Sequence, residues 1–153
     1  MTDEGDARLP VVVGVDGSEG SVAALRWAAR YGAATGTPVR AVLVWHYPTA
    51  AAVPPVGHVP EPVEKEVEEG EMATLREAIA KAAPDTPGVH IDGVIRNGHP
   101  AGELIEESGR AGLLVVGRRG HGGFLGMHIG SVSQHCVNAA QCPIVVVRST
   151  GGS

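Results

Sequence analysis

The sequence predicts an α/β protein, a five-stranded doubly wound parallel sheet with helices on both faces. Short valine-rich runs alternate along the chain with longer segments whose apolar residues recur every three or four positions. The connections between successive strands are long enough for the crossovers that parallel pairing requires. Hydrophobic residues make up 43% of the 153 residues but aromatic residues only 3%, which favours the aliphatic core of a buried parallel sheet. We expect the strand order 3-2-1-4-5.

The first part of the pattern is strand, helix, strand. Residues 10–16 form a β-branched run that ends in an acid, and Ser18 follows as the expected N-cap of a helix over residues 19–35. A Gly-Thr-Pro sequence ends this helix, and residues 39–46 form the second strand. The expected packing face of the helix consists of small and aliphatic residues at helical spacing: Val22, Leu25, Ala29 and Gly32.

Prolines dominate the segment that follows, so residues 47–60 are expected to form a surface loop. A helix should begin near Glu61 or Pro62, because proline is tolerated in a first turn. It should end before the turn cluster at residues 84–88, and the third strand is expected over residues 90–95. The apolar stripe of this helix is expected at four positions: Val63, Val67, Leu75 and Ile79.

The last part of the chain supplies two more helices and two more strands. A short helix is expected after Pro100, with Leu104 on its packing side, followed by a buried strand over residues 113–116. A glycine-rich loop leads to a helix over residues 131–140, and residues 144–147 form the fifth strand.

Composition and charge exclude several classes of function. The net charge of −5 argues against general nucleic-acid binding, which needs a basic surface. The acidic start has no signal-peptide pattern, no segment is long and apolar enough for a membrane span, and Cys136 and Cys142 are expected to be reduced thiols. We therefore expect a cytoplasmic protein, with one domain over residues 1–153, a core at about 10–148, and flexible tails at 1–8 and 149–153.

The candidate site lies where the strand order reverses. In open parallel sheets ligands bind beyond the carboxyl ends of the strands at this point, so Asp16 and Gly117 should face one crevice if the first and fourth strands are neighbours. The Walker, dinucleotide and nucleophile-elbow motifs are absent. What the chain has is Gly117-x-x-Gly120, nine residues, then Gly130-Ser131 at a helix start, a strand–loop–helix arrangement suited to phosphate.

Simpler interpretations exist for the same residues. Gly117, Gly120 and Gly130 can serve a tight loop that needs positive φ, and Asp16 can cap the first helix. Ser131 begins a capping-box pattern that ends at Gln134. Three histidines recur every seven residues, but no carboxylate or thiolate completes a zinc site, so no metal cluster is expected: His121, His128 and His135.

The glycine spacing and its flanks, VVVGVDGS at the start and GSVSQHCVNAAQCPIVVVR at the end, resemble the nucleotide-binding universal stress proteins. The similarity runs in order over residues 10–148 and is greatest to single-domain actinobacterial members. It implies an adenine nucleotide, usually ATP, in the crevice, and homodimers joined through the last strand. The predicted dimer strand comprises Ile144, Val145, Val146 and Val147.

The resemblance also implies individual site residues. Gly14, Val15 and Asp16 contribute from the first strand, with Gly14 beside the adenine and Asp16 near the ribose. In the hydrolase alternative given below, Asp16 would also help to hold Mg²⁺. Val44 corresponds to the adenine wall. The backbone at Val116 and Gly117 meets the sugar. The expected phosphate contacts come from the loop and the last helix: Arg119, Gly120, Gly130, Ser131, Val132 and Ser133.

Two functions follow from this site. One is a nucleotide-binding stress-response or signalling protein, whose dimer changes its affinity for a partner when ATP is bound. The other is a slow Mg²⁺-dependent ATP hydrolase. Hydrolysis needs a group that positions water, and no Glu, Gln or His stands at an obvious place for it except His121. We therefore expect binding with at most weak ATPase activity, and no catalytic residue is assigned.

Overall fold

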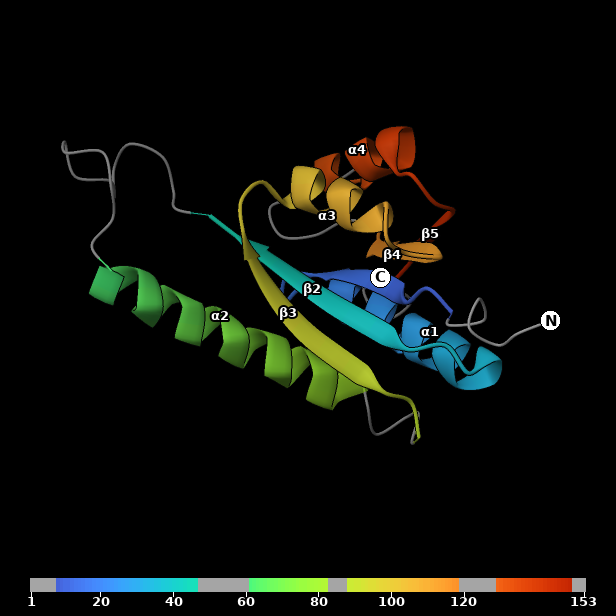
Figure 1. Ribbon diagram of the computed structural model, residues 1–153, viewed down its shortest axis with the longest axis horizontal. Coiled ribbons are helices and arrows are strands. Elements are labelled where there is room, and N and C mark those ends of the chain that lie inside the picture. The colour runs from blue at the N-terminus through green and yellow to red at the C-terminus, as the bar shows by residue number, and fades with distance from the viewer. Residues whose placement is uncertain (1–7, 47–60, 83–87, 119–128, 150–153) are drawn as a thin grey trace.

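The structure is a computed structural model that describes residues 8–46, 61–82, 88–118 and 129–149. Within these residues, strands and helices alternate in the predicted order (Figure 1). The elements are β1 (Val11–Val15), α1 (Glu19–Thr35), β2 (Val39–Trp45), α2 (Glu61–Ala82), β3 (Ile91–Asn97), α3 (Pro100–Ser108), β4 (Leu113–Gly117), α4 (Ser131–Ala139) and β5 (Ile144–Val147). Strand boundaries differ from the predicted ones by at most two residues. The largest difference is in β3, which continues to Asn97 because it pairs with β2 as far as Trp45.

The five strands form one parallel sheet in the order β3-β2-β1-β4-β5. This confirms the predicted fold class and strand order. It also confirms that β1 and β4 are neighbours, since Val11, Val12 and Val13 pair with residues 113–115. The strand order therefore reverses between β1 and β4, and their carboxyl ends are adjacent.

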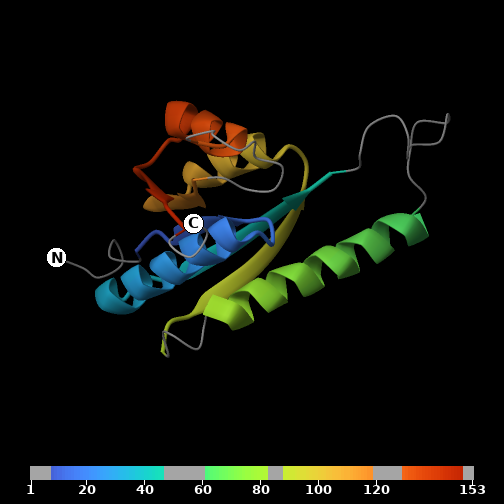
Figure 2. The same cartoon turned by 180° about the vertical axis from the view of Figure 1, so that it is seen from behind.

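Helices cover the two faces of the sheet in pairs. In both views α1 and α2 lie on one side of the strands and α3 and α4 on the other (Figures 1 and 2). The alternation of side chains along β1 explains the two layers. Val11 and Val13 pack with Leu25 of α1 and Leu75 of α2, whereas Val12 on the opposite face belongs to the cluster under α3 and α4.

Both layers are mainly aliphatic, as the low aromatic content predicts, although Trp45 is buried in the layer under α1 and α2. Leu25, Leu43, Leu75 and Leu114 are fully buried, and each such side chain contributes about 1.5–3 kcal/mol to folding. The predicted stripe of α2 is wrong at Val63, which is 44% exposed. The reason is geometric, because the start of α2 projects past the ends of the strands and has no sheet beneath it (Figure 1).

The ends of α1 are those the sequence predicts. Ser18 is its N-cap and accepts a hydrogen bond from the Ser21 N–H, and Gly36 ends the helix with a left-handed φ of 69°. The proline-rich segment 47–60 lies outside the described residues. No helix among the described residues has the length and apolar content that a bilayer crossing requires.

Candidate functional site

The junction of β4 and α4 lies at the carboxyl edge of the sheet, beside the end of β1. Two backbone hydrogen bonds hold it there: the Arg118 N–H donates to the Val147 carbonyl at 2.9 Å, and the Gly130 N–H donates to the Arg118 carbonyl at 2.7 Å. The predicted contacts Arg119 and Gly120 lie outside the described residues, as do His121 and His128. The start of α4 is thus fastened directly to the end of β4.

Among the described residues, no side-chain cap is made at the first turn of α4. Its N-cap is Gly130, in an extended conformation (φ −74°, ψ 162°). The capping-box interpretation of Ser131 is therefore wrong, because Ser131 is the first helical residue and its side chain is exposed. The helical hydrogen bonds begin with Gln134 N–H to Gly130 carbonyl at 2.9 Å. The N–H groups of residues 131–133 precede that bond, at the positive end of the helix dipole, where an anion is favoured.

Ser133 has a structural partner inside this turn. It is 5% exposed, and its hydroxyl donates a hydrogen bond to the Gly117 carbonyl. That bond ties the helix to the last residue of β4, so a ligand would meet the backbone N–H of Ser133 rather than its hydroxyl. Val132, the other neighbour in this turn, is half-buried against the core under α3 and α4.

Asp16 follows β1 and has an exposed side chain. Its carboxylate accepts hydrogen bonds from the Ser18 N–H at 2.9 Å and from the Ser18 hydroxyl. The simpler interpretation, in which Asp16 itself caps α1, is wrong, because Ser18 is the N-cap. Asp16 instead orients that cap while its carboxylate stays at the carboxyl edge of the sheet.

The glycines of the motif do not serve positive φ angles where the structure describes them. Positive φ occurs at Gly17, Gly36, Gly88 and Gly98, and Gly130 is extended. A Cβ on Gly117 would lie 2.7 Å from the Gly20 carbonyl oxygen, so this glycine lets the backbone of α1 pack against β4.

The other strand residues predicted for the site lie on different faces of the sheet. Gly14, Val44 and Val116 lie on the face of α3 and α4, and a Cβ on Gly14 would lie 2.7 Å from Leu104 Cδ1. The side chain of Val15 is buried in the opposite core, so only its backbone is available at the crevice.

Two polar features at either end of α3 were not predicted from the sequence. At its start, the rings of His46 and His99 are stacked, with centroids 5.8 Å apart and planes 13° apart. Both residues follow the ends of adjacent strands, which is the signal that could have indicated the pair.

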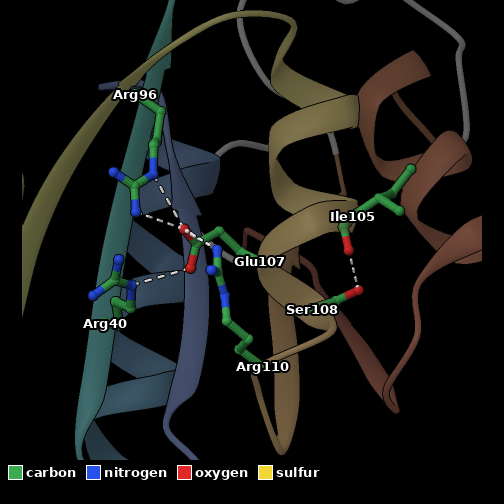
Figure 3. A network of polar contacts seen from close by, with 6 residues as sticks. All are labelled: Arg40, Arg96, Ile105, Glu107, Ser108 and Arg110. Atoms are coloured by element: carbon green, nitrogen blue, oxygen red, sulfur yellow. Dashed lines mark hydrogen bonds and ion pairs between the residues drawn. The ribbon is translucent and has the colours of Figure 1, made fainter.

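The second feature is a cluster around Glu107, which we call the Glu107 cluster: Glu107, Arg40, Arg96 and Arg110. Arg40 Nε lies 3.1 Å from one carboxylate oxygen, and Arg96 Nη2 lies 3.0 Å from the other (Figure 3). Arg110 approaches the latter oxygen at 3.5 Å. Burial alone would raise the pKa of Glu107, but the hydrogen bonds and charges of Arg40 and Arg96 outweigh it and hold the pKa below its ordinary value.

The cysteines fit structural roles. Cys136 is fully buried in the core under α3 and α4, and burial raises the pKa of its thiol to about 11. A thiol with this pKa is not a nucleophile at neutral pH. Both cysteines are free. Across the described parts of the chain, no group of three or more His, Cys, Asp or Glu side chains is arranged to hold a metal ion.

The sequence and the fold are both similar to those of known proteins. The sequence model of the Universal stress protein family matches residues 8–148. This chain belongs to that family. A universal stress protein of Mycolicibacterium smegmatis is 38% identical over 143 residues, which are 94% of this chain and 47% of that protein. The chain spans about half the length of the curated relatives it matches.

Solved structures of universal stress proteins share the fold. The UspA protein from Lactobacillus plantarum superposes with a TM-score of 0.74 at 22% identity, covering 92% of this chain and 99% of the other. A universal stress protein crystallised in complex with cAMP superposes with a TM-score of 0.67 at 25% identity, covering 94% and 98%. The fold of this universal stress protein is thus the fold of the family.

Proposed function

We propose that this universal stress protein binds an adenine nucleotide, ATP or a close relative, at the carboxyl ends of β1 and β4. The observation that carries the proposal is the start of α4, which is bonded to the strand end at the switch point and has no side-chain cap from any residue that the structure describes. Such a helix end attracts phosphate through its N–H groups and its dipole. The related protein that was crystallised with cAMP supports an adenylate as the ligand class.

The proposal assigns each part of the nucleotide to a part of the crevice. The phosphates meet the backbone of residues 130–133, with Arg119 and Gly120 as the predicted loop contacts. The ribose lies near Asp16 and the backbone of Val116 and Gly117. The base extends toward Gly14 and Val44. When Mg²⁺ accompanies ATP, the Asp16 carboxylate is the group that would hold it.

The test is a binding titration with a variant that occupies the phosphate position without harming the helix. Aspartate is a favoured N-cap and can adopt the backbone angles of Gly130, so Gly130→Asp should keep the stability of the protein. Its carboxylate would stand where the phosphate binds, and ATP affinity measured by calorimetry should fall at least about 100-fold. Gly130→Ala, which adds no charge and no cap, is the matched control.

Two results would contradict the proposal. Wild-type protein that binds none of ATP, AMP and cAMP at millimolar concentration would overturn it. Unchanged ATP affinity in Gly130→Asp would put the nucleotide elsewhere. A phosphate-release assay on the same samples separates a binding protein from a hydrolase, because release abolished by Asp16→Ala would show turnover at this site.

We further propose that the protein is a homodimer joined by antiparallel pairing of Ile144–Val147, acting as a cytoplasmic stress-response or signalling module. β5 is an edge strand with half-buried side chains, and edges of this kind are usually covered. The carbonyls of Pro143 and Val147 accept hydrogen bonds from the β4 side, so alternation directs the N–H of Val146 outward. The free cysteines accord with a reducing compartment.

Val146→Pro tests the dimer because it removes an outward N–H and leaves the pairing with β4 in place. Sedimentation should show a dimer for the wild type and a monomer for the variant at micromolar concentration. A wild-type monomer under these conditions would overturn the proposed dimer without affecting the nucleotide site.

A further inference from the structure

We propose that the stacked imidazoles of His46 and His99 form an aromatic platform for the base of the bound nucleotide. This inference rests on the proposed function and deepens it, because it names the residues that recognise the base. The two rings come from segments 53 positions apart and are both exposed, yet they lie parallel within 13° with centroids 5.8 Å apart. An exposed pair in this arrangement leaves an aromatic face available to a further ring.

The backbone holds the pair in place. His46 follows the last residue of β2, and His99 is the N-cap of α3. Between them, the Gly98 N–H donates a hydrogen bond to the Trp45 carbonyl at 2.8 Å. The residue before each histidine is therefore bonded to the other segment, and the stacking follows from the fold.

The pair also lies on the sheet face, and at the distance from Asp16, that the proposed position of the nucleotide requires. Side chains alternate along β2, and Val42 and Val44 face α3 and α4, so His46 belongs to the same face. The register pairs Gly14 with Val42, which puts Asp16 level with Val44 on the neighbouring strand. From strand spacing and rise, His46 is then about 8 Å from Asp16 along the backbone surface, a separation that one nucleoside spans.

The chemistry of the surroundings makes this pair the suitable base contact. Bases stack on aromatic side chains through their π-faces. Among the described residues the other stacked pair, Trp27 with Tyr31, lies on α1, on the opposite side of the sheet from α3. Val44 supplies an aliphatic wall beside the crevice, and the two imidazoles supply the aromatic surface.

The experiment compares a ligand that has a base with one that lacks it. ATP and inorganic tripolyphosphate are titrated by calorimetry into wild-type protein, His46→Ala, His99→Ala and the aromatic variant His99→Phe. Each alanine variant should weaken ATP binding about tenfold and leave tripolyphosphate binding unchanged, and His99→Phe should restore ATP affinity. His90→Ala removes an exposed histidine just before the amino end of β3 and is the matched control.

A second measurement does not depend on variants that fold. In NMR spectra of the wild type, ring currents from the adenine should shift the carbon-bound protons of His46 and His99 when AMP is added, and tripolyphosphate should not. Unchanged ATP affinity in both alanine variants, an equal loss for both ligands, or no ring-current shift with bound AMP would each overturn the platform. In those cases the nucleotide site itself stands, whereas a wild type that binds no adenine nucleotide overturns both proposals.

Discussion

The Glu107 cluster and the start of α4 are both polar regions on the same side of the sheet, but their polar groups have different partners. Glu107 is 3% exposed, and both of its carboxylate oxygens accept hydrogen bonds from arginines of β2 and β3 (Figure 3). The start of α4 has Gly130 as its N-cap and, within the described parts of the chain, no side-chain cap. The Glu107 cluster therefore has its partners within the fold, whereas the start of α4 presents backbone N–H donors at the carboxyl edge of the sheet.

The difference separates stability from binding. Removing one partner from a group of charges paired inside the chain destabilises the folded state, because the remaining charges are left without compensation. Backbone N–H donors at a helix start without a side-chain cap contribute little to folding but favour an anionic ligand. Substitutions in the Glu107 cluster should therefore change the free energy of unfolding, and substitutions at the crevice should change nucleotide affinity.

The largest expected effect is on stability and comes from Glu107→Gln. This change keeps the size of the side chain but removes the charge that three arginines share, and the free energy of unfolding should fall by about 2–3 kcal/mol. Urea denaturation measures it, with Glu106→Gln, the exposed neighbouring glutamate, as the control. ATP affinity of the folded variant should stay within about twofold of the wild type. A loss of affinity as large as that of Gly130→Asp would contradict the separation of stability from binding.

The pH dependence of stability should show the same cluster. The folded pKa of Glu107 is lowered, so its stabilising contribution is fully present above the ordinary value of 4.5 and is lost as pH falls through the folded pKa. The difference in unfolding free energy between wild type and Glu107→Gln should be constant from pH 7 to about 5 and shrink below that range. A difference that grows on acidification would contradict the lowered pKa.

Gly117→Ala tests whether a residue of the proposed crevice also contributes to stability. A Cβ there would lie 2.7 Å from the Gly20 carbonyl oxygen and 2.8 Å from its carbon, and backbone atoms cannot move aside easily. We expect a loss of about 2 kcal/mol in unfolding free energy from overpacking. Gly102→Ala, at an exposed helical glycine with no contact closer than 3.8 Å, is the control and should not destabilise. If Gly117→Ala is as stable as the wild type, packing against α1 does not require this glycine, and its role is in ligand binding alone.

The smallest effect should come from Asp16→Asn, which tests whether the charge at the crevice serves the metal ion or the nucleoside. Asparagine keeps an oxygen for the Ser18 N–H, so thermal stability should be nearly unchanged. Removing the charge should weaken binding of Mg²⁺–ATP about tenfold and change binding of AMP less. Equal losses for both ligands would show that Asp16 serves the nucleoside and not the metal.

The sequence predicted much of the fold and most of the positions now proposed for the site. Valine-rich runs identified the strands because burial on both faces leaves few alternatives for such segments. Ser18 and Gly36 identified the ends of α1 because caps act within one turn. The spacing from Gly117 to Gly130 identified a strand end followed by a helix start, and the structure joins both through Arg118.

The failures have a common physical cause. Val63 fits the helical period of α2, but periodicity does not reveal where the sheet beneath a helix ends. The capping-box pattern at Ser131 is local and plausible, but the bond from Gly130 to Arg118 starts the helix at Ser131 and leaves Gly130 as its cap. In both places the arrangement of the fold, which the local sequence does not specify, decided the outcome.

Local chemistry thus determined the elements and the glycine motif, since strands, caps and turns depend on residues within a few positions of one another. Only the tertiary structure brought Arg40 to Glu107 across 67 positions, Arg96 across 11, and His46 beside His99. It also showed that Gly117 has the backbone of α1 behind it. These relations follow from the strand order β3-β2-β1-β4-β5, because hydrogen bonding and packing across neighbouring strands decide which distant side chains meet.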